Sequence, residues 1–259
     1  MRTVERIERR SFLSLLTVGV GVMLTGCGAT SSAGPHVPAP RKAFPPPVPG
    51  RVHTVSHVPG HTRNIVLTVD DGADPATLAA YVRLAQDTGI ALTFDANGMR
   101  ADSWDPQAAA LAPLIEKGQV QIANHTFHHR PLVGLSDADA RAELERNEDW
   151  IQATFNTSSR PYFRPPNGSV DHASNALAGE LGYTTVLMWN GTFGDATLIS
   201  PGSLLAAADK ALQPSAVVVG HANAPTVTQL YPQILELIKS RNLTPVTLDD
   251  AFGTSRRSG

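Results

Sequence analysis

Two adjacent aspartates and a later pair of histidines have the types and spacing of a metal-dependent hydrolytic site. Asp70 and Asp71 follow the apolar run 65–69, and His125 and His129 come further along the chain. One carboxylate and two imidazoles form the ligand set of a catalytic Zn²⁺ that keeps one position open for water. Because side chains alternate at the end of a strand, we expect the second carboxylate to point elsewhere and to take a proton from that water.

The histidine cluster allows more than one ligand pair. His125 and His129 are four residues apart, so on one helical turn both rings face the same side and can reach one ion. His125 and His128 form a competing pair three residues apart, and one of two adjacent histidines can instead be a hydrogen-bonding neighbour. A polar loop without any metal is a further interpretation. The residues alone leave these alternatives open.

Short apolar runs alternate with helical patterns from residue 64 onward, which is typical of parallel β/α units. Strands are expected near 65–69, 90–95, 120–123, 161–163, 184–188, 215–220 and 244–247. Asp74 with Pro75, and Ser136 ahead of a long segment through Phe155, predict helix starts, whereas Gly118 and Gly182 predict helix ends. This order of elements predicts an α/β sheet that curls into a barrel.

Polar residues follow the predicted strands at several points in the chain. Active sites of such barrels are built from the carboxyl ends of the strands. The residues at these ends are Asp70, Asp71, His125, His129, Arg164, Trp189 and His221. We therefore expect them on one face of the barrel. Arg164 keeps a structural alternative as a surface turn residue that pairs with any carboxylate, and His221 keeps one as an ordinary strand-end histidine.

Four short motifs occur in an informative order. They are Thr68-Val69-Asp70-Asp71-Gly72, His125-Thr126-Phe127-His128-His129, Arg164-Pro165-Pro166-Asn167-Gly168 and Val219-Gly220-His221. Together they resemble the motifs of the polysaccharide deacetylases, carbohydrate esterase family 4 with its NodB-type homology domain. The resemblance covers about residues 63–252 and implies an irregular (β/α)7–8 barrel of the polysaccharide deacetylase type.

The resemblance also implies a role for each matching position. Asp71, His125 and His129 would bind a divalent metal, most simply Zn²⁺, although Co²⁺ or another transition metal suits the same ligands. Asp70 would be the general base and Arg164 would hold it by an ion pair. His221 would be the general acid that protonates the departing amine, and the backbone N–H of Asn167 would stabilise the oxyanion.

The chain departs from the family pattern at several positions. Arg130 replaces the usual proline after the second metal histidine and adds a positive charge, and Asn167 stands where tyrosine is common. In the weak fourth motif only Asp195 remains as a carboxylate that could orient His221, and Ala196 replaces a tryptophan. Trp189 has two interpretations, as a wall of the sugar site or as part of the core.

Composition and charge limit the class of protein. The chain has 259 residues, of which 42% are hydrophobic and 17% charged, as in a globular protein with one α/β domain. The net charge of −2 argues against a nucleic-acid partner. The family resemblance implies an N-acetylated glycan as the partner, and we expect a monomer.

The beginning of the chain predicts export and membrane attachment. Residues 1–26 have an arginine-rich start and a short apolar stretch, which is typical of a signal peptide for twin-arginine or general secretory export. Cys27, the single cysteine, ends a segment that resembles a bacterial lipobox, although a structural cysteine in a secreted protein is the alternative. Residues 27–62 are rich in proline and predict a tether, followed by a catalytic domain at 63–252 and a tail at 253–259.

These observations predict a lipid-anchored, extracytoplasmic enzyme on the outer face of a bacterial cell membrane. The expected reaction is metal-dependent removal of N-acetyl groups from peptidoglycan or a chitin-like N-acetylglucosamine polymer, with release of acetate. Attachment beside the cell wall favours peptidoglycan. Two alternatives stay open: a non-catalytic glycan-binding lipoprotein, and an O-acetyl xylan esterase on the same scaffold.

Overall fold

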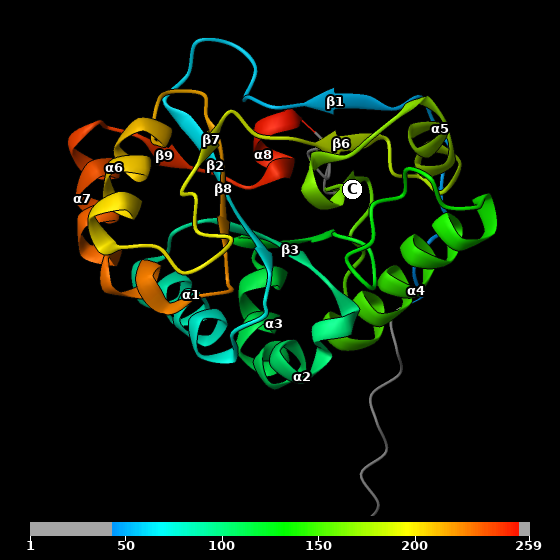
Figure 1. Cartoon of the computed structure of the whole chain (residues 1–259), viewed down its shortest axis with the longest axis horizontal. Coiled ribbons are helices and arrows are strands. Elements are labelled where there is room, and N and C mark those ends of the chain that lie inside the picture. The colour runs from blue at the N-terminus through cyan, green and yellow to red at the C-terminus, as the bar shows by residue number, and fades with distance from the viewer. Residues whose placement is uncertain (1–42, 254–259) are drawn as a thin grey trace, which may run out of the picture. The chain divides into compact units, whose positions relative to one another are not determined.

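A computed structural model describes residues 43–253. Its centre is a nine-stranded parallel sheet with the order β1-β6-β5-β4-β3-β2-β8-β7, and β9 pairs with β2 (Figure 1). The strands are β1 (His53–Val55), β2 (Asn64–Asp71), β3 (Leu92–Ala96), β4 (Val120–Asn124), β5 (Tyr162–Phe163), β6 (Thr185–Leu187), β7 (Gly191–Thr192), β8 (Val217–His221) and β9 (Thr244–Pro245). All nine run parallel to their neighbours, so their carboxyl ends meet at one edge.

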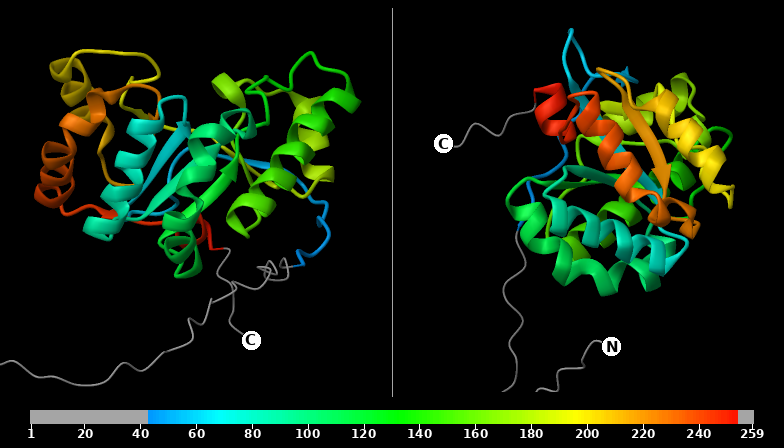
Figure 2. Two further views of the ribbon diagram at one scale, coloured as in Figure 1. Left: turned by 90° about the horizontal axis from the view of Figure 1, so that it is seen from below. Right: turned by 90° about the vertical axis from the view of Figure 1, so that its left-hand side faces the viewer.

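Helices connect successive strands and pack around the sheet. They are α1 (Pro75–Thr88), α2 (Ala101–Trp104), α3 (Ala108–Glu116), α4 (Asp137–Phe155), α5 (His172–Glu180), α6 (Pro201–Ala211), α7 (Tyr231–Ser240) and α8 (Leu248–Phe252). As predicted, the side chain of Asp74 accepts backbone N–H bonds at the start of α1, and Ser136 does so for α4. In Figures 1 and 2, α6 and α7 lie at one end of the molecule and α4 and α5 at the other.

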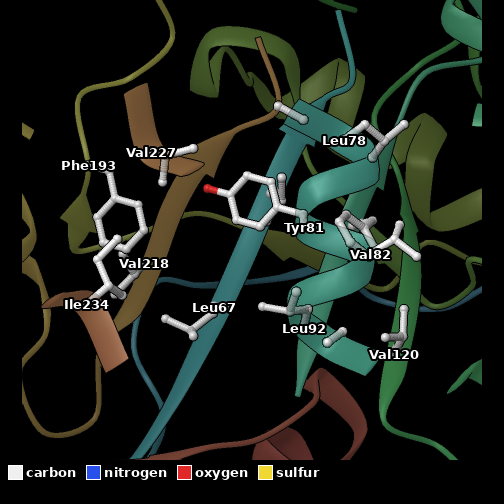
Figure 3. Packing of buried hydrophobic residues seen from close by; sticks show 14 of the residues in the cluster. Leu67, Leu78, Tyr81, Val82, Leu92, Val120, Phe193, Val218, Val227 and Ile234 are labelled. Carbon is white, nitrogen blue, oxygen red and sulfur yellow. The ribbon is translucent and has the colours of Figure 1, made fainter. Parts of the chain in front are cut away.

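The main core lies between the central strands and the helices beside them. Figure 3 shows Tyr81 on α1 reaching across β2 toward Phe193 and Val227, with Leu67 and Leu92 nearby. All five side chains are buried. Burial of this kind contributes roughly 1.5–3 kcal/mol for each large apolar side chain. It fixes β2, which also carries the aspartate pair, against β3 and β8.

The predicted fold class is confirmed. Each predicted strand has a counterpart among β2, β3, β4, β5, β6, β8 and β9. The short strands β1 and β7, at the two ends of the sheet order, were not predicted because two or three residues carry no measurable periodicity. The strands curl into an irregular, open barrel. An isolated antiparallel bridge between His57 and Ala216, and hydrogen bonds from the Ser215 hydroxyl to the carbonyls of Gly60 and Thr62, link the chain after β1 to the residues before β8.

The folded domain begins earlier than the predicted boundary at residue 63. Residues 53–55 form β1 and pair with β6, Val58 is buried, and the N–H of Gly50 donates to the carbonyl of Gly179 over 3.0 Å. The tether prediction therefore fails for these residues, since prolines on either side of a short strand do not prevent pairing at the edge of a sheet.

Several predictions concern residues outside the described range. These are the signal peptide at 1–26, Cys27 with the first part of the tether, and residues 254–259 of the tail. At the other boundary, α8 ends at Phe252 and Gly253 takes a left-handed φ of 72°. Within 43–253, none of the helices combines the length and the apolar character needed to cross a membrane.

Candidate active site and metal centre

The end of β2 places two carboxylates at the edge of the sheet where the carboxyl ends of the strands meet. Asp70 is 4% exposed and lies in register with Asp95 on β3 and His221 on β8. Asp71 has a left-handed φ of 71°, which interrupts the alternation of side chains. Both carboxylates consequently lie near the Nε2 atom of His125, at 3.7 and 3.5 Å, so the expectation that one of them points elsewhere is wrong.

A close contact behind Asp71 explains the glycine that follows it. The indole Nε1 of Trp104 donates a 2.8 Å hydrogen bond to the carbonyl of Asp71. A Cβ atom on Gly72 would lie 2.5 Å from that same nitrogen, and Gly72 itself has a φ of 95°. Glycine is therefore required at this position, and the buried Trp104 fixes the backbone that carries Asp71.

The two histidines come from a loop after β4 rather than from a helical turn. Thr126 and His129 have left-handed φ values of 61° and 55°. The amide of Asn97 donates to the carbonyls of His125 and Thr126, over 2.5 and 2.8 Å, and holds the loop open. The predicted helical turn is wrong, yet the ring centroids of His125 and His129 lie 4.9 Å apart and on one side of the loop.

Asp71, His125 and His129 bring one ligand atom each to a common point. Their candidate ligand atoms all lie within 4.8 Å of one another. The Oδ1 atom of Asp71 is 3.5 Å from Nε2 of His125 and 3.3 Å from Nε2 of His129. A tetrahedral ion with bonds of about 2.0–2.1 Å holds neighbouring ligand atoms roughly 3.3–3.4 Å apart. The donor set and its spacing therefore fit a small divalent cation.

His128 faces away from this point. Its Nδ1 atom lies 2.9 Å from Oε1 of the buried Glu143, and its backbone N–H donates to Oε2 over 2.8 Å. Arg130 also approaches Glu143, with 3.8 Å between Nη1 and Oε1. Of the pairs left open by the sequence, the geometry brings together His125 and His129.

Hydrogen bonds orient two of the three candidate ligands. Nδ1 of His125 donates to the carbonyl of Arg164 over 2.8 Å, which leaves the Nε2 lone pair for a cation. The amide of Asn223 donates to Oδ2 of Asp71 over 2.7 Å, so that Oδ1 is the oxygen that faces the two histidines. Asn223 was missed in the sequence, although its place two residues after His221 at the end of β8 was an available signal.

The charges of these groups depend on one another. Burial raises the pKa of Asp71, but its hydrogen bonds to His125 and Asn223 and the charges of His125 and His129 outweigh this effect and hold it well below its usual value. Burial lowers the pKa of His125, yet Asp70 and Asp71 raise it to about 9. A cation bound here would displace a proton from His125, so we expect metal affinity to weaken as the pH falls.

Arg164 lies fully buried between two carboxylates. Its Nη1 atom is 2.7 Å from Oδ1 of Asp70 and 3.1 Å from Oδ2 of Asp95, and it donates to Thr68 Oγ1 over 2.5 Å. The predicted ion pair with Asp70 is thus present. It occupies Oδ1 and leaves Oδ2 of Asp70 facing His125.

Asp95 was missed by sequence reasoning. It is fully buried, and burial raises the pKa of its carboxyl group despite the nearby Arg164. An aspartate at the end of the predicted strand 90–95 was the signal in the sequence. The register of the two strands, which brings both carboxylates to one guanidinium, could be seen only in the structure.

His221, which is partly buried, pairs with the buried Asp195 on the other side of Asp70. Nδ1 of His221 donates to Oδ1 of Asp195 over 3.1 Å, and Asp195 is 2% exposed. Burial lowers the pKa of His221, but the hydrogen bond and charge of Asp195, together with Asp70, raise it above its usual value. The Nε2 atom of His221 stays available for proton transfer.

One cavity of about 660 Å³ lies at the carboxyl ends of the strands, and its lining includes Asp70, Asp71, His125, His129, His221 and Asn223. Asn167, with a left-handed φ of 57°, and the half-buried Trp189 also line it. The Trp189 ring centroid is 5.7 Å from Cζ of Arg164, and a Cβ atom on Gly168 would lie 3.1 Å from the ring. Trp189 therefore both packs against the core and forms part of the cavity wall.

Comparison with known proteins gives a consistent result. Residues 53–186 match the sequence profile of the polysaccharide deacetylase family. An uncharacterised protein of Streptomyces coelicolor is 29% identical over 242 residues, which cover 88% of this chain and 89% of that protein. A peptidoglycan-N-acetylglucosamine deacetylase of Bacillus cereus is 28% identical over 134 residues, which cover 50% of this chain and 58% of the relative.

A solved structure has the same fold. A family 4 carbohydrate esterase pseudoenzyme of Bacillus anthracis superposes with a TM-score of 0.67 at 18% identity, over 77% of this chain and 68% of the other. At this identity the likeness concerns the fold alone, and the fold therefore does not distinguish an active enzyme from an inactive relative. The family profile spans more than half of the chain, and the chain belongs to the polysaccharide deacetylase family.

Proposed function

We propose that this protein is a metal-dependent deacetylase that hydrolyses N-acetyl groups of a cell-wall or environmental glycan and releases acetate. The observation that carries the proposal is the convergence of Asp71, His125 and His129 on one point, with the second carboxylate, Asp70, 3.7 Å from Nε2 of His125. Three protein ligands with an adjacent unliganded base form the arrangement of a catalytic rather than a structural metal site.

Each residue has a task that its contacts support. A bound Zn²⁺ or similar ion would polarise the acetamide carbonyl and acidify a water molecule. Asp70 accepts the proton of that water at Oδ2, because Arg164 already occupies Oδ1. Arg164 also prevents rotation of the carboxylate, since the guanidinium is buried and bonded on several sides.

Departure of the amine needs a proton from the opposite side of the acetamide. His221 can supply it from Nε2, because Asp195 holds Nδ1 and favours the protonated ring. We propose that the backbone N–H of Asn167, which lines the cavity, donates to the oxyanion. The products are acetate and a free amine on the sugar.

The substrate class is inferred from the family and the predicted location. The Bacillus cereus relative is a peptidoglycan-N-acetylglucosamine deacetylase, which supports a glycan of that type. Attachment through a lipid on Cys27 after twin-arginine or general secretory export would keep the enzyme outside the cell membrane and next to the wall. Zn²⁺ is the proposed ion, and the protein is proposed to act as a monomer.

Metal analysis and acetate release test this proposal together. Purified wild-type protein should hold one divalent ion per chain and should remove acetyl groups from an N-acetylglucosamine oligomer, as measured by mass spectrometry. His125→Ala should lose both the ion and the activity. His128→Ala is the matched control and should keep the ion, because Glu143 holds its ring away from the site. An inactive wild-type protein that carries its ion and binds the oligomer would contradict the proposal.

Two alternatives predict different outcomes in the same assay. A non-catalytic glycan-binding lipoprotein would bind the oligomer without releasing acetate. The weak fourth motif suggested this alternative, yet Asp195 still contacts His221, which favours the enzyme. An O-acetyl xylan esterase would release acetate from acetylated xylan but not from the N-acetylglucosamine oligomer.

A further inference from the structure

The turn after β3 also borders the candidate site. None of the four sequence motifs includes this turn. This turn, η1 (Gly98–Arg100), follows Asn97, whose amide holds the histidine loop. Its backbone is fixed on two sides: the N–H of Gly98 donates to Asn147 over 2.7 Å, and the N–H of Met99 donates to the carbonyl of Phe127 over 2.9 Å. The turn and the loop that carries His125 and His129 therefore form one rigid unit.

Arg100, at the end of this turn, lies at the wall of the candidate active-site cavity. It lines the cavity together with Asp71, His129 and His221, and its side chain is half-buried. Throughout residues 43–253, its guanidinium has neither an ion pair nor a hydrogen bond. By contrast, the guanidinium groups of Arg160 and Arg164 are bound to carboxylates.

A half-buried guanidinium without a partner is a receptor for an anion. Its planar donors match a carboxylate in two parallel hydrogen bonds, which a hydroxyl group or an acetamide cannot satisfy. The aspartates of the cavity do not fill this role, because Asp70 is paired with Arg164 and Asp71 with the histidines and Asn223. A carboxylate partner for Arg100 is therefore not supplied by these aspartates, and a substrate that enters the cavity can bring one.

We propose that Arg100 binds a carboxylate of the glycan beside the acetamide that reacts, so that the site selects an anionic glycan over a neutral one. This inference rests on the proposed function. The sugar carboxylate that fits is the lactyl group of N-acetylmuramic acid, which alternates with N-acetylglucosamine in peptidoglycan. A neutral chitin oligomer offers no such group, and Arg100 therefore determines specificity without taking part in the reaction.

Binding measurements test the inference independently of turnover. The probes are a peptide-free tetrasaccharide of alternating N-acetylglucosamine and N-acetylmuramic acid, and the same tetrasaccharide with its lactyl carboxylates amidated. Wild-type, metal-loaded protein should bind the anionic form about tenfold more tightly, roughly the difference of one charge-assisted pair. Arg100→Gln should abolish this difference, and Arg100→Lys should restore part of it.

The matched control is Arg83, an exposed arginine on α1 that lines a different cavity. Arg83→Gln should leave the tenfold preference intact. Equal affinity of the wild-type protein for the two tetrasaccharides, or a preference that survives in Arg100→Gln, would overturn the inference. A protein that shows the preference but releases no acetate would refute the proposed enzyme and leave the binding role of Arg100 established.

Discussion

Buried carboxylates at the two ends of the barrel have opposite environments. Glu148, on α4 near the amino end of β5, accepts hydrogen bonds from Ser158, Ser159, Gln152, Arg160 and Tyr183. Burial raises its pKa, but these donors lower it below the usual value. Both oxygens are saturated, so Glu148 has no capacity left for chemistry.

The carboxylates at the carboxyl ends of the strands are only half satisfied. Arg164 takes one oxygen of Asp70, Asn223 takes one of Asp71, and His221 takes one of Asp195. In the described part of the chain, Oδ2 of Asp195 is buried without a partner. Glu148 thus stabilises the fold, whereas Asp70 and Asp71 are each oriented through one oxygen and direct the other toward the histidines.

The largest expected effect is a loss of stability when Glu148, the fully hydrogen-bonded carboxylate, is removed. Glu148→Ala leaves Arg160, Tyr183 and two serines without their acceptor, and breaking a buried pair in this way costs roughly 3–5 kcal/mol. Urea denaturation should show that loss in the free energy of unfolding, with kcat changed less than tenfold below the melting temperature. Glu145→Ala, an exposed position on the same helix, is the control and should cost less than about 1 kcal/mol. Loss of kcat without loss of stability would break the comparison.

Asn223→Ala should weaken metal binding by about 10–100-fold, because partners that orient a metal ligand contribute effects of this size. Without its hydrogen bond, Asp71 can rotate and its Oδ1 atom no longer stays near both histidines. Competition with a chelator measures the affinity. Asn223→Asp tests the geometry separately, since it keeps the size of the side chain but replaces the donor with a charge. Unchanged affinity in Asn223→Ala would show that Asp71 is fixed by other contacts.

Asp195→Asn should have the smallest effect and the most specific one. The carboxylate raises the pKa of His221, so its removal lowers that pKa and the acid form is lost at lower pH. The alkaline limb of the kcat profile should therefore move to lower pH, and kcat at neutral pH should fall by about tenfold, less than the loss expected on removing the acid itself. An unshifted limb would mean that another group supplies the proton.

The sequence was most informative where a pattern of apolar residues extended over several residues or where several motifs occurred in order. The positions of seven strands, the starts of α1 and α4 and the convergence of Asp70, His125 and His221 on one edge followed from apolar runs, capping residues and motifs. Left-handed φ values at Asp71, Thr126 and His129 could not be predicted, because they depend on Trp104 and Asn97, which are distant in the chain.

The functional residues that the sequence did not reveal were missed for the same reason. Asp95 and Asn223 act through strand register and side-chain orientation, which a single sequence does not encode locally. β1 was missed for a related reason: its pairing with β6 joins segments far apart in the chain and offers no local pattern.

The central claim is that adjacent aspartates have different tasks, and one paired measurement tests it most directly. Metal content and acetate release are determined side by side for Asp70→Asn and Asp71→Asn. We predict that Asp70→Asn keeps one ion per chain but loses activity by about 10²–10⁴-fold, and that Asp71→Asn loses the ion as well. An Asp70→Asn protein without metal, beside an Asp71→Asn protein that retains it, would contradict the account.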